Sequence, residues 1–214
     1  AACREAGLKS VAVTAGYITE EPRAEFFAAM DAANIDLKGF TDTFYRKLTG
    51  SEIAPVLEAI RYAVHESDCW VELTTLLIPG ENDSEAELTE LSRWVVEACG
   101  PDVPVHFTAF HPDHRMLGHE RTPLETLLRA RGIARAAGLR HVYIGNAHHI
   151  EAQSSYCAGC GVRVIGRDWH LLSDWRLDDF GGCTTCGTPF PGVIDGAPGT
   201  WGRRRQPIRM HEVS

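Results

Sequence analysis

An acidic and a basic side chain stand two residues apart in a segment that otherwise has the composition of a buried strand. The segment begins the stretch NIDLKGFTDTFYRKLTG, and the two residues are Asp36 and Lys38. Side chains at such a spacing share one face of a strand, so both are predicted to point the same way. In a parallel sheet with covered faces, a charged pair must be satisfied locally or serve chemistry. A plain ion pair at the strand end is the alternative interpretation.

Alternating strand and helix patterns surround this pair. Short apolar, β-branched segments are separated by helical patterns at steps of roughly 30 residues, which is typical of right-handed βαβ units with a parallel sheet. The predicted strands are 10–15, 34–38, 69–78, 103–110 and 141–145, and the predicted helices are 22–33, 53–65, one beginning at 84 and one over 122–138. The pattern predicts an α/β fold, about half to two-thirds of a (β/α) barrel, with an open doubly wound sheet as the alternative.

Two of the predicted helices begin with capping signals. Ser84 stands three residues before Glu87, which is the spacing of a capping box. Thr122 is followed by Pro123 and, three residues on, by Glu125, which predicts an N-cap at Thr122.

Polar residues follow four of the predicted strands. In (β/α) barrels the functional residues lie at the carboxyl ends of strands, so these positions favour a site there. They are Thr14 and Gly16, Asp36 and Lys38, His111, and Asn146. The sequence has no GxGxxG or GxxxxGK[ST] loop, so a nucleotide site of those kinds is not predicted.

Two CxxCG motifs follow the barrel pattern, Cys157-Ala-Gly-Cys160-Gly and Cys183-Thr-Thr-Cys186-Gly, with 22 residues between them. Two thiolates at this spacing reach one ion, and two such pairs predict a tetrahedral four-cysteine site in a zinc-ribbon or rubredoxin-like domain. Iron in the same site and a pair of disulfides are the alternatives. The remaining cysteines are scattered and predicted to be core thiols, namely Cys3, Cys69 and Cys99.

Composition limits the class of protein. With 44% apolar and 23% charged residues and a formal charge of -8, the chain is predicted to be globular and cytoplasmic, with no nucleic-acid partner and no membrane span. The composition changes near residue 150, so we expect a barrel part over 1–150, a four-cysteine domain over 151–195 and a flexible tail over 196–214. Because the chain opens without Met in what reads as the end of a helix, it is expected to be the carboxy-terminal part of a longer protein.

With these residues in place, the chain resembles the radical S-adenosylmethionine (radical SAM) enzymes related to pyruvate formate-lyase activating enzyme, in particular those of the AmmeMemoRadiSam system. The matching stretches occur in the family's order within residues 7–193. They are VAVTAGYITEEP, NIDLKGFTDTFYRKLTG, LIPGENDSEAEL, VPVHFTAFHPDHRM, TPLETLLRAR, HVYIGNAHH, YCAGCG and CTTCG.

The resemblance implies a site for SAM. Asp36 and Lys38 match the family's DLK motif, which holds the methionyl end of SAM, and His111 matches a histidine that faces SAM. Thr14 and Gly16 match the TNG turn near the ribose, although the turn here reads Thr-Ala-Gly and lacks the amide.

The resemblance also implies a reaction and its partners. In the family, a [4Fe-4S] cluster bound by a CxxxCxxC loop reductively cleaves SAM to a 5'-deoxyadenosyl radical, which abstracts hydrogen from a substrate. That loop does not occur in the 214 residues. The implied partners are SAM, an electron donor for the cluster and an unknown substrate, for which a protein is one candidate. Two alternatives remain, a Schiff-base lyase that uses Lys38 as its nucleophile and a non-catalytic zinc-ribbon interaction protein.

Overall fold

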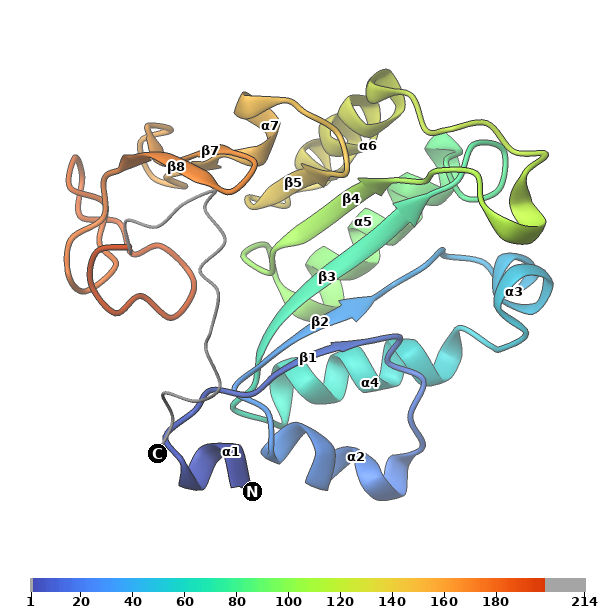
Figure 1. Cartoon of the computed structure of the whole chain (residues 1–214), viewed down its shortest axis with the longest axis horizontal. Helices are drawn as coiled ribbons and strands as arrows, with labels where there is room; N and C mark the ends of the chain where they lie inside the picture. Colours follow the sequence, from blue (N-terminus) through green and yellow to red (C-terminus); the bar gives the residue numbers. More distant parts are fainter. Residues whose placement is uncertain (1, 199–214) are drawn as a thin grey trace, which may run out of the picture. The chain divides into compact units, whose positions relative to one another are not determined.

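The computed structural model describes residues 2–198, which form two compact units (Figure 1). The first unit ends at Ala147 and the second begins at His148. Within the described residues, no helix combines the length and the apolar composition needed to cross a membrane.

A parallel sheet of five strands forms the centre of the first unit. The strands are β1 (Val11–Thr14), β2 (Ala32–Asp36), β3 (Trp70–Leu77), β4 (Val105–Ala109) and β5 (Val142–Gly145). They lie side by side in the order β1-β2-β3-β4-β5, as Figure 1 shows. Every crossover therefore steps in the same direction, and right-handed crossovers of this kind place their helices on one face of the sheet. This is the geometry of a partial (β/α) barrel, whereas a doubly wound sheet reverses direction, so the predicted partial barrel is confirmed.

The helices of the first unit vary in length and type. They are α1 (Ala2–Glu5), α2 (Glu20–Ala28), α3 (Asp42–Phe44), α4 (Ala54–His65), α5 (Glu85–Cys99) and α6 (Leu124–Ala136). A π-helix over Tyr45–Thr49 continues α3, and a 3-10 turn covers His114–Met116. In Figure 1, α5 and α6 lie behind β3 and β4.

The two faces of the sheet differ sharply. Residues that alternate along the strands on the helix side are fully buried, among them Ile35, Leu73 and Phe107. The residues between them are only half-buried and mostly polar; they are Asn34, Asp36, Glu72, Thr74, His106, Thr108 and Tyr143. The sheet thus carries one apolar face against its helices and one polar face that no helix covers among the described residues.

Some predicted boundaries are wrong. The helix predicted over 22–33 ends at Ala28, and the strand predicted to begin at residue 34 begins at Ala32. Backbone pairing of Ala32 with β1 and a 2.7 Å hydrogen bond from the Ser10 N–H to the Asp31 carboxylate take these residues out of the helix. Tertiary pairing here outweighs the helix propensity of the alanines.

The capping predictions were half right. Ser84 caps α5, because its hydroxyl accepts the Glu87 N–H at 3.2 Å. The side chain of Thr122 does not cap α6, whose N-cap residue is Pro123. Its hydroxyl instead accepts the Phe110 N–H at 2.9 Å and donates to the Leu77 carbonyl at 2.5 Å, so it ties the ends of β3 and β4 together.

The second unit is a small antiparallel sheet with a short helix. Its elements are α7 (Ile150–Gln153), β6 (Ser155–Tyr156), β7 (Arg163–Asp168) and β8 (Leu171–Trp175), with strand order β6-β7-β8. The predicted four-cysteine domain after the barrel is confirmed as this fold. From residue 199 on, the predicted tail lies outside the described residues.

Candidate functional site

Asp36 and Lys38 form an ion pair at the carboxyl end of β2. The Lys38 Nζ lies 2.7 Å from Asp36 Oδ2, and the two side chains are 37% and 31% exposed. Both belong to the polar, helix-free side of β2, while Ile35 and Leu37 are fully buried on the other side. A carboxylate and an ammonium group therefore stand together where a charged ligand can reach them.

Side chains, rather than neighbouring strands, hold the backbone around Lys38. Pairing between β2 and β3 ends at Asp36 opposite Thr74, so the next residues lie beyond the sheet's hydrogen-bond ladder. The Thr75 hydroxyl donates to the Leu37 carbonyl at 2.8 Å, and Asn82 Nδ2 donates to the Lys38 carbonyl at 2.6 Å. Both of these donors are buried.

Two further side chains complete the support. The Lys38 N–H donates to the hydroxyl of Tyr45 at 3.1 Å, and the Phe40 N–H donates to Glu87 Oε1 at 2.7 Å. Burial raises the pKa of Tyr45 to about 12, so the phenol stays neutral at physiological pH. Burial also raises the pKa of Glu87, while the Phe40 N–H opposes that shift. A second layer of hydrogen bonds of this kind fixes the geometry of the side chains that bind a ligand or take part in catalysis.

Thr14 and Gly16 form a tight turn at the end of β1. The Gly16 N–H donates to the Thr14 hydroxyl at 3.1 Å, and Gly16 is buried with φ +67°. A Cβ on Gly16 would lie 2.7 Å from Ile35 Cγ2, so glycine is needed there for both conformation and space. Thr14 is in register with Ile35, which places it on the helix-covered side of the sheet.

His111 lies two residues beyond β4 and is exposed. The Thr122 hydroxyl fixes the backbone just before it, through the Phe110 N–H. The structure thus places Asp36 with Lys38, and Thr14 with Gly16, as two local groups. Convergence of His111 with Asp36 and Lys38 on one ligand stays a prediction.

A carboxylate–imidazole pair extends the polar face beyond Asp36. Glu72 Oε2 lies 2.7 Å from His106 Nε2, and the His106 ring stacks on Tyr143 with centroids 5.1 Å apart. In register, Asp36 lies opposite Thr74, which lies opposite His106. The ion pair and the imidazole therefore share one row across three neighbouring strands.

A second charged cluster ties three loops together at the carboxyl ends of the strands. Glu81 accepts from Lys47 Nζ at 2.7 and 2.8 Å, and one of its oxygens lies 3.1 Å from His119 Nε2. The hydrogen bond from Lys47, followed by that with His119, lowers the pKa of Glu81. The π-helix and the loops after β3 and β4 are joined through this one carboxylate.

Sequence reasoning missed the residues that support the pair. Asn82 and Tyr45 lie within the quoted stretches LIPGENDSEAEL and NIDLKGFTDTFYRKLTG but were assigned no role. The capping-box pattern pointed to Glu87, whose carboxylate in fact binds the Phe40 N–H. The available signal was an asparagine shortly after a strand and a Pro-Gly turn. If such an amide is buried at the strand end, it must find hydrogen-bond partners there.

The four motif cysteines come together in the second unit. Their sulfur atoms all lie within 4.8 Å of one another, with Cys157 and Cys186 at 3.5 Å and Cys160 and Cys183 at 3.9 Å. Metal–sulfur bonds of about 2.3 Å in a tetrahedron require sulfur separations of roughly 3.5–4 Å, so the cluster fits a tetrahedral ion such as zinc.

The two cysteine motifs share one backbone design. In each, the glycine after the second cysteine has φ +74° and donates its N–H to the carbonyl of the first, from Gly161 to Cys157 at 2.9 Å and from Gly187 to Cys183 at 2.7 Å. The hydrogen bond between Cys186 Sγ and the Thr188 hydroxyl, followed by that with the Thr188 backbone, lowers the pKa of Cys186 to about 6, which favours the thiolate that a metal binds.

The other cysteines take no part in this cluster. None of the seven cysteines, which all lie in the described part of the chain, is in a disulfide. Cys69 is buried and Cys99 half-buried, but Cys3 is exposed on α1, so the prediction of a core thiol is wrong for Cys3. Burial raises the pKa of Cys99 to about 12.

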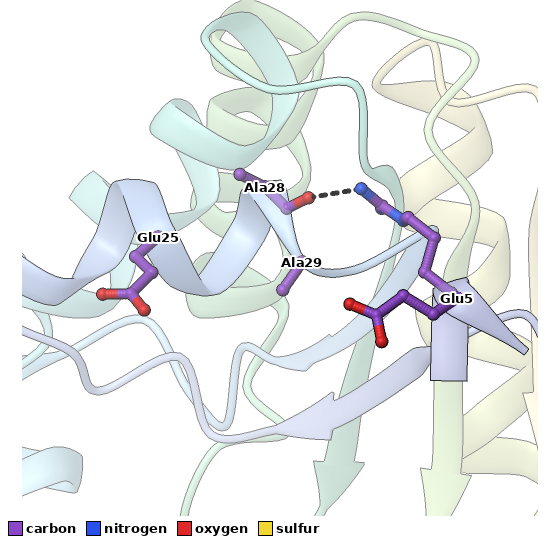
Figure 2. Close-up of a pocket in the computed structure, with 5 residues that line it drawn as sticks. Glu5, Glu25, Ala28 and Ala29 are labelled. Atoms are coloured by element: carbon purple, nitrogen blue, oxygen red, sulfur yellow. Dashed lines mark hydrogen bonds between the residues drawn. The ribbon is translucent and has the colours of Figure 1, made fainter. Parts of the chain in front are cut away.

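An open pocket between α1 and the end of α2 does not have the character of a cofactor site. Figure 2 shows Glu5, Glu25, Ala28 and Ala29 around it, with the guanidinium of Arg4 donating to the Ala28 carbonyl at 3.0 Å. Since α2 leads into the amino end of β2, this pocket lies away from the carboxyl ends of the strands, where barrels place their functional residues.

Comparison with known proteins gives one relative of similar sequence. No family model matches the chain. Over 192 residues, or 89% of this chain, the sequence is 40% identical to the uncharacterized protein MJ0808 of Methanocaldococcus jannaschii. The match covers 56% of that protein, so the chain spans about half the length of the curated relative it matches.

Two solved structures share the fold of the first unit. A domain of pyruvate-formate lyase-activating enzyme from Bacteroides vulgatus superposes with a TM-score of 0.59 at 18% identity, covering 68% of this chain and 86% of that one. A radical SAM methyltransferase from Sphaerobacter thermophilus gives 0.53 at 20% identity, covering 65% and 41%. At these identities the likeness shows the fold alone, a parallel α/β sheet like that of a radical SAM domain.

Proposed function

We propose that this chain supplies the carboxy-terminal part of a radical SAM active site and that Asp36 and Lys38 bind the methionyl end of SAM. The observation that carries the proposal is the Asp36–Lys38 pair, held on the uncovered polar face of a radical SAM-like sheet. A zwitterionic amino acid offers a carboxylate to the Lys38 ammonium and an ammonium to the Asp36 carboxylate. The pair thus has the charges and donors that this ligand requires.

Other residues of the chain would bind and orient the same ligand. The turn at Gly16 offers backbone groups at the end of β1, where the resemblance implies that the ribose lies. His111 offers a ring nitrogen from the end of β4. Tyr45 and Asn82 keep the Lys38 backbone fixed, so the ammonium group is placed before the ligand arrives.

The iron–sulfur cluster does not fit the residues of this chain. Cys157, Cys160, Cys183 and Cys186 are gathered for one tetrahedral ion, and the other three cysteines are dispersed. In radical SAM enzymes the cluster supplies the electron that cleaves SAM to a 5'-deoxyadenosyl radical. We propose that its ligands come from outside these 214 residues, and that the four-cysteine site holds a structural zinc ion.

The test compares two forms of the protein. The product of the complete gene, reconstituted with iron and sulfide and given a reductant, is expected to form 5'-deoxyadenosine from SAM, and the 214-residue chain is expected to form none. A complete protein that contains no CxxxCxxC motif, or that binds a cluster but never cleaves SAM, contradicts the proposal.

The Schiff-base alternative is less well supported by the geometry. A lysine that attacks a carbonyl needs a free amine, whereas Lys38 Nζ is held by the Asp36 carboxylate at 2.7 Å. Borohydride trapping of a carbonyl compound on Lys38 would nevertheless revive it.

A further inference from the structure

We propose that Asn82 is a positioning residue for Lys38, and that its side-chain amide sets where the Lys38 ammonium group stands in the site. This inference rests on the proposed SAM site and adds a residue to it that touches neither SAM nor the Asp36 carboxylate. Its mechanism is the support of one peptide unit at the end of β2.

The Asn82 amide bonds three separate backbone groups through both of its N–H donors and its oxygen. Its Nδ2 donates to the Lys38 carbonyl at 2.6 Å and to the Leu76 carbonyl at 2.9 Å, and its Oδ1 accepts the Ile78 N–H at 2.7 Å. The residue is 2% exposed, so water does not compete for these groups. One side chain thus joins the ends of β2 and β3 to the turn that follows β3.

Lys38 depends on this support because the sheet does not hold it. Its N–H donates to the Tyr45 hydroxyl and its carbonyl accepts from Asn82, so both of its backbone polar groups are bonded to side chains. The strand ladder ends two residues earlier, at Asp36. A shift of either side chain would therefore turn the Lys38 peptide and carry the ammonium group with it.

The turn that carries Asn82 is itself anchored. Gly80 has φ +78°, and its N–H donates to Asp83 Oδ1 at 2.8 Å. Glu81, between them, is bonded to Lys47 of the π-helix. The residues on both sides of Asn82 in the chain are therefore held by hydrogen bonds, and these bonds fix the position of its side-chain amide.

Only an amide satisfies the three partners. An aspartate of the same shape could accept the Ile78 N–H, but its second oxygen would face the Lys38 and Leu76 carbonyls without a proton to give. Asn82→Asp therefore keeps the volume and reverses the donor end, which makes it a sharper variant than alanine.

The composition of the chain offers a direct readout. The 214 residues contain three lysines, Lys9, Lys38 and Lys47. The chain labelled selectively with ¹⁵N-lysine should therefore give three backbone amide signals in an NMR spectrum. Lys38 reports the support, while Lys9, which lies just before β1, is an internal control.

The experiment records these signals for the wild-type chain and for Asn82→Asp, first without ligand and then during titration with SAM. For the wild type, SAM should move the Lys38 signal and leave Lys9 in place. In Asn82→Asp the Lys38 signal should already differ without SAM, and the SAM concentration at half-saturation should rise about tenfold or more, equivalent to 1.4 kcal/mol or more. Asn82→Ala, which removes all three bonds without introducing a charge, should move the same signal and serves if Asn82→Asp does not fold.

The matched control is Ile60→Val, a substitution at a fully buried position in α4. An isoleucine side chain makes no hydrogen bonds, so this change removes none of the bonds that hold Lys38. It should lower the melting temperature without changing the Lys38 signal or the SAM affinity. If folded Asn82→Asp or Asn82→Ala keeps both the wild-type Lys38 signal and the wild-type affinity, the positioning role is overturned and the proposed function stands. If the Lys38 signal of the wild-type chain does not respond to SAM and Lys38→Ala leaves SAM binding by the complete protein unchanged, the proposed SAM site fails, and the inference that rests on it fails too.

Discussion

Gly16→Ala should destabilise the protein far more than the same substitution at another glycine with the same backbone conformation. Gly16 and Gly50 both have φ +67°. A Cβ at Gly16 would lie 2.7 Å from Ile35 Cγ2, whereas a Cβ at Gly50 would meet nothing within 4 Å. The two sites therefore share the conformational cost of alanine and differ in the steric cost.

The magnitudes follow from these two costs. A left-handed conformation costs an L-residue about 1–2 kcal/mol, which is the whole expected effect at Gly50. Forcing a methyl group into a packed core adds about 1–3 kcal/mol, and Ile35, which the methyl group would meet, is fully buried. Gly16→Ala should therefore lower the free energy of unfolding by about 2–5 kcal/mol, against a total of about 5–15 kcal/mol for an ordinary domain.

Urea unfolding of Gly16→Ala, Gly50→Ala and the double variant Gly16→Ala/Ile35→Leu measures the steric part. Leucine lacks the Cγ2 methyl that the new Cβ would strike, so the cost of Gly16→Ala should shrink toward that of Gly50→Ala in this background. Equal costs for Gly16→Ala and Gly50→Ala in the wild-type background would show that the end of β1 yields easily, and that the close approach of Gly16 to β2 has no energetic weight.

Four further outcomes are expected. Lys38→Ala should weaken SAM binding by the complete protein while its zinc content stays the same, and equal loss of both would mean general misfolding. Chelation, or Cys183→Ser, should unfold the second unit with loss of one zinc ion per chain, because a structural four-cysteine site supplies roughly 10 kcal/mol or more of its folding free energy; a metal-free unit that stays folded under reducing conditions would contradict this. Burial lowers the pKa of His141 below its usual value of 6.5, so the unfolded chain takes up the proton first. The free energy of unfolding should therefore fall as the pH drops through 6.5, by at most about 1.4 kcal/mol per pH unit. A His141→Gln variant with the same dependence on pH would show that another group causes it. Val13 is 81% exposed on edge strand β1, so the chain should self-associate in sedimentation experiments and Val13→Lys should reduce this, whereas a monodisperse wild-type monomer would show that the edge is protected.

Local spacing was enough to predict the parts of the site that depend on a single segment. The alternation around Asp36 predicted which side chains share a face, and two CxxCG motifs predicted four sulfurs in one place. Both follow from the period of a strand or of a tight turn, which the chain carries within a few residues.

Features that depend on distant partners could not be predicted in the same way. Ala32 reads as helical until β1 lies beside it, and Thr122 reads as a helix cap until the Leu77 carbonyl and the Phe110 N–H lie within reach. Asn82 and Lys38 are 44 residues apart, and only the parallel order of β2 and β3 brings them together. Propensity and motif spacing carry no information about such pairs until the topology is known.

The π-helix makes the loop after β2 intolerant of changes in length. Within five residues it directs the Tyr45 hydroxyl to the Lys38 N–H and the Lys47 ammonium group to Glu81, and it closes with the Gly50 N–H donating to the Tyr45 carbonyl. A π-turn holds one residue more than an α-turn, so deleting Arg46 would convert the segment to an ordinary α-helix. Lys47 would then follow Tyr45 directly, about 100° away around an α-helix, and its ammonium group would no longer point toward Glu81 while the Tyr45 hydroxyl points toward the Lys38 N–H. Related chains should therefore differ from this one by substitution within residues 45–49, and gaps in an alignment should fall elsewhere.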